Sequence, residues 1–158
     1  MGNLRIVLLF LLVHISYSCD NESINSGDSS CFQIDNNDRN NYTISRKWEF
    51  LGFFHQDTHM EDCKPVTLGE MSIVFSNTSR FHAVSSCNTI EGFYSVVAPD
   101  AIKIDSVSTT LILCIDDTIR LWEQRYIDEL KNALNFRINR NILVIETTSK
   151  NSIVFKAD

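Results

Sequence analysis

Short strand-like stretches separated by polar turns fill residues 47–158, and they constrain the fold more than any other feature of this sequence. Most are about four to eight residues long and rich in Val, Ile, Phe, Tyr or Trp, as β-strands are. In residues 101–105, apolar and charged side chains alternate, which is typical of a strand with one buried face. The candidate strands are residues 48–54, 71–75, 80–84, 90–97, 101–105, 108–113, 136–138, 142–146 and 152–155.

One helical period interrupts this pattern. Ile119, Trp122, Tyr126, Leu130 and Leu134 recur at steps of three or four residues, which places them on one face of a helix. We therefore expect one α-helix over about residues 117–134.

The start and the outer face of this helix also have signals. Asp116 or Asp117 is suited to cap its N-terminus, because a carboxylate there accepts from free backbone N–H groups. Arg125 and Glu129 have the i,i+4 spacing of a stabilising ion pair. We expect both features to support the helix.

The order of these elements predicts the fold class. Strands and helices do not alternate, which argues against a parallel α/β sheet. The sequence predicts a mainly β fold, a small antiparallel and partly open β-barrel of about seven to nine strands with the helix packed over one opening. Residues 56–69 are expected to form a polar loop.

The N-terminus has the pattern of an export signal. A short n-region with Arg5 precedes an apolar stretch over residues 6–15, and Ser16 and Ser18 are small residues in front of Cys19. The apolar stretch is too short to span a bilayer, which needs about 20 residues. We expect residues 1–18 to be a signal peptide. Either ordinary signal peptidase or lipoprotein signal peptidase would leave Cys19 first, and we favour a lipid on Cys19.

Residues 19–46 are rich in Asp, Asn and Ser, and we expect them to form the lipid-attachment site and a flexible polar tether. The folded domain is then residues 47–158. The formal net charge of −6 argues against a nucleic-acid partner, which would need a basic face. We expect membrane attachment to depend on the lipid alone and the protein to be a bacterial lipoprotein of the outer membrane or facing the periplasm.

Cysteine usage fits export. Of the five cysteines, Cys19 is assigned to the lipid, and the other four can pair in three ways. We favour Cys87 with Cys114 and Cys31 with Cys63, because disulfides are the default in an oxidising compartment. Free buried thiols are the alternative.

A set of short motifs follows a fixed order along the domain. The motif residues are Trp48, Cys87-Asn88, Gly92 and Tyr94, Ser108-Thr109 before Cys114, Glu123 and Tyr126 with Leu130, and Val154-Phe155. Each motif is weak alone, and together they resemble the META domain family, which includes the bacterial heat-shock protein HslJ. The resemblance covers about residues 47–156, with Ser86 where the family often has Gly and Ile112-Leu113 where it often has Met-Ala.

This resemblance implies an exported or lipid-anchored protein associated with envelope stress, drug tolerance or virulence, without a general catalytic activity. It implies structural roles for Trp48, Asn88, Gly92, Tyr94, Thr109 and Glu123. We therefore expect a protein that is not an enzyme, has no cofactor, and acts through contacts with an envelope protein in envelope stress or maintenance.

Two other functions are compatible with the residues. The aromatic side chains would line an apolar ligand cavity if the barrel were hollow, which would make the chain a small-ligand carrier. His55, His59 and Asp62 are metal-ligand types and would serve a metal-dependent enzyme if they converged on one point.

Overall fold

Alternation between buried and exposed side chains builds the strands of the domain. In the strand Thr89–Val96, Ile90 and Tyr94 point into the core while Glu91 and Phe93 point outward. The same alternation places Trp48 and Phe50 on the core-facing side of the first strand. One apolar face per strand therefore produces one shared core.

The computed structural model describes residues 31–32 and 43–158, which contain nine strands, one α-helix and one short 3₁₀ helix. The predicted leader (residues 1–18), Cys19 and most of the predicted tether lie outside the described residues. The elements are β1 (Lys47–His55), β2 (Met60–Cys63), η1 (Val66–Leu68), β3 (Ser72–Phe75), β4 (Arg80–Val84), β5 (Thr89–Val96), β6 (Ile102–Thr109), α1 (Asp117–Lys131), β7 (Ala133–Asn139), β8 (Ile142–Thr147) and β9 (Asn151–Ala157).

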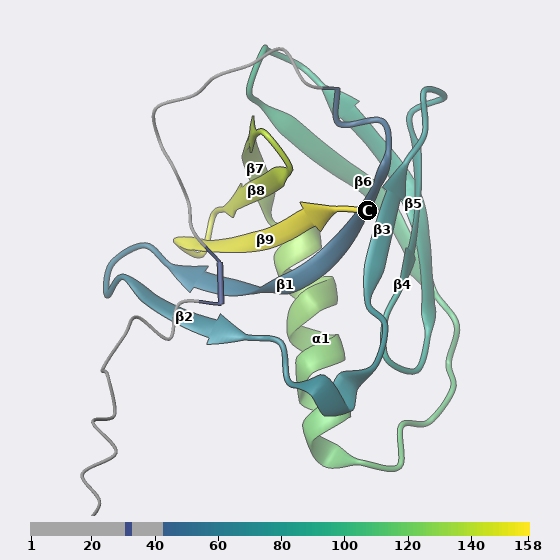
Figure 1. The fold of residues 1–158 in the computed structure, drawn as a ribbon. Coiled ribbons are helices and arrows are strands. Elements are labelled where there is room, and N and C mark those ends of the chain that lie inside the picture. Colours follow the sequence, from purple (N-terminus) through teal and green to yellow (C-terminus); the bar gives the residue numbers. More distant parts are fainter. Residues whose placement is uncertain (1–30, 33–42) are drawn as a thin grey trace, which may run out of the picture.

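All nine strands belong to one antiparallel sheet in the order β6-β5-β4-β3-β1-β9-β8-β7, and β2 pairs with the second half of β1. The two end strands approach each other at one point, where Ala101 bridges Asn135 and the Phe136 N–H donates to the Asp100 carbonyl at 2.7 Å. The sheet is therefore a curled half-barrel (Figure 1), as the sequence predicted.

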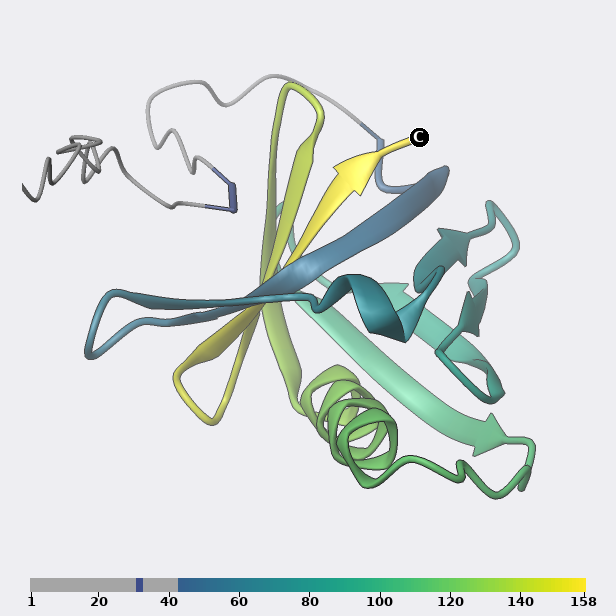
Figure 2. The same ribbon diagram turned by 60° about the horizontal axis from the view of Figure 1, so that its bottom comes forward.

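Helix α1 covers the inner face of this half-barrel, against β9 and β6 (Figure 2). Tyr126 lies with its ring centroid 5.1 Å from that of Phe50, and Trp122 stacks on Phe53 at 5.5 Å. Phe50 also packs on Phe155, at 5.9 Å. Aromatic rings from the helix and the sheet thus fill the space between them.

Gly52 lies at a β-bulge in the first strand. The β1–β9 register shifts between Phe50 and Gly52. Gly52 has φ +155°, and a Cβ there would lie 2.3 Å from the Asp62 carbonyl oxygen. Only glycine allows β2 to approach β1 this closely.

Three local predictions were wrong. The expected polar loop at residues 56–69 contains β2 and η1, because β1 continues far enough to offer β2 a pairing edge. The expected strand at residues 108–113 ends at Thr109 with β6. The helix ends at Lys131, so Leu134 lies in β7 and is 49 % exposed instead of continuing the helix face.

Contacts with the barrel begin before β1. Ile44 is buried, and its carbonyl accepts a hydrogen bond from Trp48 Nε1 at 2.9 Å. Within the described residues, no helix has the length and apolar character to cross a membrane.

Candidate functional site

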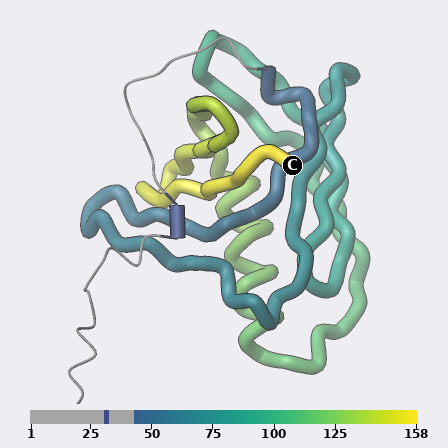
Figure 3. The backbone as a smooth tube through the Cα atoms, in the orientation of Figure 1, coloured from purple at the N-terminus to yellow at the C-terminus, as the bar shows by residue number. Residues whose placement is uncertain are grey.

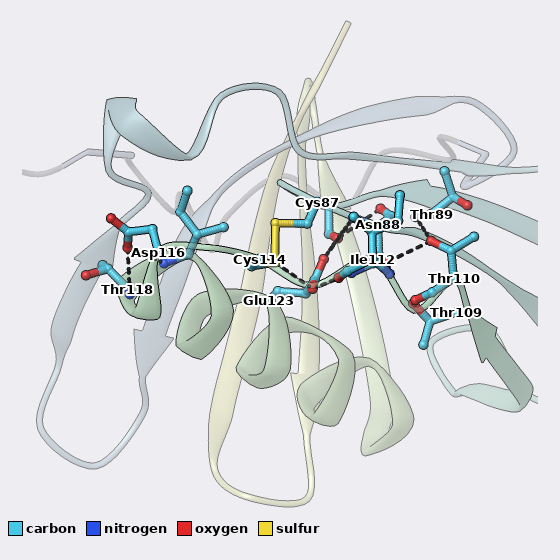
Figure 4. The surroundings of a disulfide bond; sticks show 12 residues. Cys87, Asn88, Thr89, Thr109, Thr110, Ile112, Cys114, Asp116, Thr118 and Glu123 are labelled. Carbon is cyan, nitrogen blue, oxygen red and sulfur yellow. Dashed lines mark hydrogen bonds between the residues drawn. A yellow bond between two sulfur atoms is a disulfide. The ribbon is translucent and has the colours of Figure 1, made fainter.

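The turn between β4 and β5 holds the loop before α1 through one buried amide. Asn88 Oδ1 accepts from Thr110 Oγ1 and from the Ile112 backbone N–H, both at 2.8 Å. Its Nδ2 donates to the Ile112 carbonyl at 3.1 Å and to Glu123 Oε2 at 2.8 Å. Asn88 therefore fixes the backbone of a segment more than 20 residues away (Figure 4).

Glu123 of α1 completes this arrangement from the helix side. Its side chain points away from water, at 7 % exposure, and receives hydrogen bonds from the Asn88 N–H at 3.0 Å and from the Ser85 hydroxyl. Its Oε2 lies 3.4 Å from the Sγ of Cys114. Every hydrogen-bonding partner named here is a neutral donor, an arrangement suited to a carboxylate that only accepts.

The Cys87–Cys114 disulfide joins the same two segments covalently. Its Cα atoms are 5.9 Å apart, and the pairing is the one favoured from the sequence. Cys114 is 9 % exposed. The motif cluster, which we define as Cys87, Asn88, Cys114 and Glu123, therefore ties the β4–β5 turn, the loop before the helix and the helix itself.

Loop 110–115, which the motif cluster holds, exposes apolar side chains. Leu111 is 94 % exposed, Ile112 63 %, Leu113 82 % and Ile115 100 %. Asp116 then caps α1, accepting from the Thr118 and Ile119 N–H groups at 2.7 and 3.1 Å. The loop is thus fixed at both ends while its aliphatic side chains face solvent.

The other motif residues lie in the barrel. Gly92 stands opposite Phe81 on β4, and a Cβ at Gly92 would come within 2.6 Å of the Phe81 ring. The Tyr94 hydroxyl donates to the Ser76 carbonyl at 2.8 Å. Thr109 is exposed, and the neighbouring Thr110 makes the bond to Asn88 instead.

The second disulfide, Cys31–Cys63, attaches the N-terminal part of the chain to β2. Its Cα atoms are 5.7 Å apart, again in the favoured pairing. Glu61 Oε2 accepts from the Cys31 N–H at 2.8 Å and lies 3.4 Å from its Sγ. Phe32 is 6 % exposed. We call Cys31, Phe32, Glu61 and Cys63 the strap; Cys63 is exposed and Glu61 half-buried.

The proposed metal ligands meet only in part. His55 Nε2 lies 2.8 Å from Asp62 Oδ2, but Arg125 NH1 donates to the same Oδ2 at 2.7 Å. His59 instead packs near Phe54, with ring centroids 6.0 Å apart. A guanidinium thus stands beside the carboxylate that a metal would need.

The ionisation of Asp62 is set by its contacts with Arg125 and His55. The hydrogen bonds from Arg125 and then from His55 hold the pKa of Asp62 below its usual range, against the effect of partial burial. Arg125 also lies over the Phe53 ring, 4.0 Å from its centroid. The expected role for Arg125, an ion pair with Glu129 on the outer helix face, is therefore replaced by contacts with β1 and β2.

Glu129 is buried as well, at 7 % exposure. It accepts from Thr147, Ser149 and Asn151 around the β8–β9 turn, each at 2.6 Å. Burial alone would raise the pKa of Glu129, but these hydrogen bonds and the charge of Arg125 outweigh it and lower the pKa. Two buried carboxylates therefore fasten α1 to the sheet at different points.

Groups with metal-ligand spacing occur at both disulfides. Among the described residues, the ligand atoms of Cys31, Glu61 and Cys63 lie within 4.8 Å of one another, and so do those of Cys87, Cys114 and Glu123. In each group the two sulfurs are bonded to each other. Neither pair is therefore present as the thiolates that bind zinc.

An antiparallel half-barrel closed by one helix, with a disulfide and a buried Asn-Glu pair at the helix entrance, defines the structural class of this protein. The META domain family model matches residues 54–158, and the chain belongs to this family. Strand β1 begins before the matched region, at Lys47.

Solved structures share the fold. A protein from Burkholderia xenovorans, determined by NMR, superimposes with a TM-score of 0.61 at 13 % identity, covering 72 % of this chain and 82 % of that one. A DUF4847 family protein from Bacteroides vulgatus superimposes with a TM-score of 0.54 at 18 % identity, covering 73 % and 94 %. No curated protein sequence matches this chain.

Proposed function

We propose that this chain is an exported, membrane-tethered protein without enzymatic activity that acts by binding another protein through loop 110–115. One observation carries the proposal: a backbone locked by Asn88 and Cys87–Cys114 exposes four aliphatic side chains in five residues. Contiguous exposed apolar side chains of this kind mark interaction sites.

The rigidity of the loop supports binding physically. Association is opposed by the entropy of ordering loops and side chains at the interface. Because the motif cluster already orders the loop backbone in the folded protein, little backbone entropy remains to be lost when a partner binds. Each Leu or Ile that becomes buried then contributes about 1.5–3 kcal/mol.

Export and tethering rest on separate features. Two disulfides suit an oxidising compartment, and residues 1–18 have the pattern of a signal peptide before Cys19. We propose a lipid on Cys19, a location at the bacterial outer membrane or facing the periplasm, and a role in envelope stress or maintenance. The lipid would hold the domain near a membrane while loop 110–115 contacts its partner.

The two alternatives have less support. A metal-dependent enzyme would need His55, His59 and Asp62 around one ion, but Arg125 pairs with Asp62 and His59 packs near Phe54 instead. The aromatic rings between α1 and the sheet pack on one another, and they occupy the place that an apolar ligand would need. A non-enzymatic binding protein is therefore the function we favour.

Site-specific photo-crosslinking in the native cell tests the proposal. A photoreactive residue replaces Ile115, which is fully exposed, or Val97, an exposed aliphatic residue after β5 that serves as the control. We expect Ile115 to form a protein adduct that Val97 does not, and L111S/L113S to diminish it.

The outcome that contradicts the proposal is the absence of an Ile115 adduct, or equal adducts from both positions. Circular dichroism of L111S/L113S should match the wild type, because both side chains are exposed. Intact-mass measurement of the exported protein tests the lipid separately, and an unmodified Cys19 would contradict the tether.

A further inference from the structure

We propose that the buried Glu123 carboxylate shields the Cys87–Cys114 disulfide from thiols, so that reductants open Cys31–Cys63 first. Reduction would then release Cys31 and Phe32 from β2 while loop 110–115 stays fixed. The strap would be a redox-sensitive attachment, and the motif cluster a redox-resistant one.

The two disulfides differ in how accessible their sulfur atoms are to a dissolved thiol. Cys114 is 9 % exposed and sits above helix α1 beside Glu123 (Figure 4). Its partner Cys87 is half-buried, whereas the strap has one half-buried sulfur, in Cys31, and one exposed, in Cys63 on β2, a strand whose one neighbour among the described strands is β1. An incoming thiolate therefore reaches a sulfur of the strap more easily.

Charge opposes reduction of Cys87–Cys114 by either route. A thiolate that attacks Cys87 Sγ expels Cys114 as a thiolate 3.4 Å from Glu123 Oε2. A thiolate that attacks Cys114 Sγ brings its own negative charge to the same place. Exchange slows when the leaving thiolate is destabilised, and a nearby like charge destabilises it. Both routes thus meet the buried carboxylate.

The strap provides an internal control for burial. Glu61 Oε2 also lies 3.4 Å from a disulfide sulfur, that of Cys31. Glu61 is half-buried, however, whereas Glu123 is 7 % exposed. Solvent screens charge interactions near the surface far more than buried ones. The same distance should therefore slow reduction less at the strap.

The chemistry is ordinary thiol–disulfide exchange. Two molecules of a small thiol are oxidised to one small disulfide, and the protein disulfide takes up two electrons and two protons to become two thiols. The first thiolate forms a mixed disulfide with the protein and displaces one cysteine, and the second thiolate displaces the other.

Timed reduction of the exported full-length protein tests the order. Neutral 2-mercaptoethanol is added under native conditions, free thiols are trapped with iodoacetamide, and peptide mass spectrometry assigns them to the four cysteines. We expect Cys31 and Cys63 to be labelled on the order of tenfold faster than Cys87 and Cys114. Equal rates, or Cys87–Cys114 opening first, would overturn the proposal.

Charged thiols separate the carboxylate from simple burial. Cationic cysteamine and anionic thioglycolate are compared at equal thiolate concentration. We expect the cysteamine-to-thioglycolate rate ratio to be larger at Cys87–Cys114 than at Cys31–Cys63. In E123Q that ratio should fall several-fold at Cys87–Cys114 alone.

A ratio that E123Q leaves unchanged would overturn the role of Glu123. E61Q is the matched variant in the strap, and a larger effect there than for E123Q would also overturn the proposal. If E123Q does not fold, the comparison of charged thiols at the two disulfides of the wild type still decides the question.

Discussion

The motif cluster and the strap are both closed by a disulfide, but different forces hold the chain around each one. In the motif cluster, Asn88 and Glu123 are buried and bound by neutral donors. Around the strap, the adjacent contact is a half-exposed ion pair between Asp62 on β2 and Arg125 on α1.

This difference implies that the motif cluster is part of the core structure of the domain, whereas the strap attaches a peripheral segment. Removing one member of a buried network leaves polar atoms without partners, which is costly. Removing one member of an exposed ion pair returns both groups to water, which costs little. We therefore expect damage to the motif cluster to weaken the whole domain, and damage at the strap to remain local.

The largest expected effect is that of Asn88→Ala. The substitution removes the partners of Thr110, the Ile112 backbone and Glu123, so we expect the free energy of unfolding to fall by about 3 kcal/mol. Urea denaturation measures it. Asn132→Ala, which removes one exposed hydrogen bond to the Asp128 carbonyl, is the matched control and should cost less than about 1 kcal/mol. Similar losses in both variants would contradict the comparison.

The second largest effect is expected from deleting each disulfide, which should destabilise the domain by different amounts in the two regions. The two closed loops are similar in length, with sequence separations of 27 and 32, so chain entropy alone predicts about 3 kcal/mol for each. We expect this loss for C87S/C114S. For C31S/C63S we expect about 1 kcal/mol or less, because the folded state gains freedom too when the strap detaches.

Thermal unfolding of both double variants checks this expectation. A loss in C31S/C63S as large as that in C87S/C114S would show that the strap is part of the cooperative fold. Limited proteolysis adds a second readout, with faster cleavage before residue 43 expected only in C31S/C63S.

The smallest expected effect is the loss of stability when acid protonates Asp62 on β2. The folded-state pKa of Asp62 lies below its usual value, so its contribution is present above the unfolded pKa of about 3.9 and is lost as pH falls through the folded value. Because Asp62 is partly exposed and screened by solvent, we expect about 0.5 kcal/mol.

Urea midpoints of the wild type and D62N measure this contribution. The two proteins should differ at pH 6, the difference should shrink as the pH falls below the unfolded pKa, and added salt should shrink the difference at pH 6. A difference that does not shrink in acid would contradict the ionic origin. Asn88→Ala should by contrast keep its effect in high salt, because Asn88 itself carries no charge and its contact with Glu123 is buried away from the screening ions.

Much of the sheet was readable from the sequence because each strand carries its own signal. Alternation in residues 101–105 placed the buried side chains of β6, Ile102 and Ile104. β2 was missed because its four residues, including Glu61 and Asp62, have no apolar face; it forms only because β1 offers an edge.

The candidate site was harder to read because its parts are polar contacts between distant segments. Residues 108–113 look like a strand, yet the Asn88 side chain takes the Ile112 backbone bonds that a neighbouring strand would take. One signal was available: Glu123 is an acid between Ile119 and Tyr126, two residues of the apolar helix face that the sequence predicted. Such a residue points to a buried polar partner, although the sequence does not say which one.

The pairing of β1 with β9 has a consequence for how the domain is made (Figure 3). The first strand of the sheet finds one of its two main neighbours in the last seven residues before Asp158. During folding, β1 therefore keeps an unpaired edge until β9, the last strand of the domain, is available to pair with it. Such long-range pairing slows folding and leaves an aggregation-prone intermediate. The domain should depend on chaperones until β9 has paired.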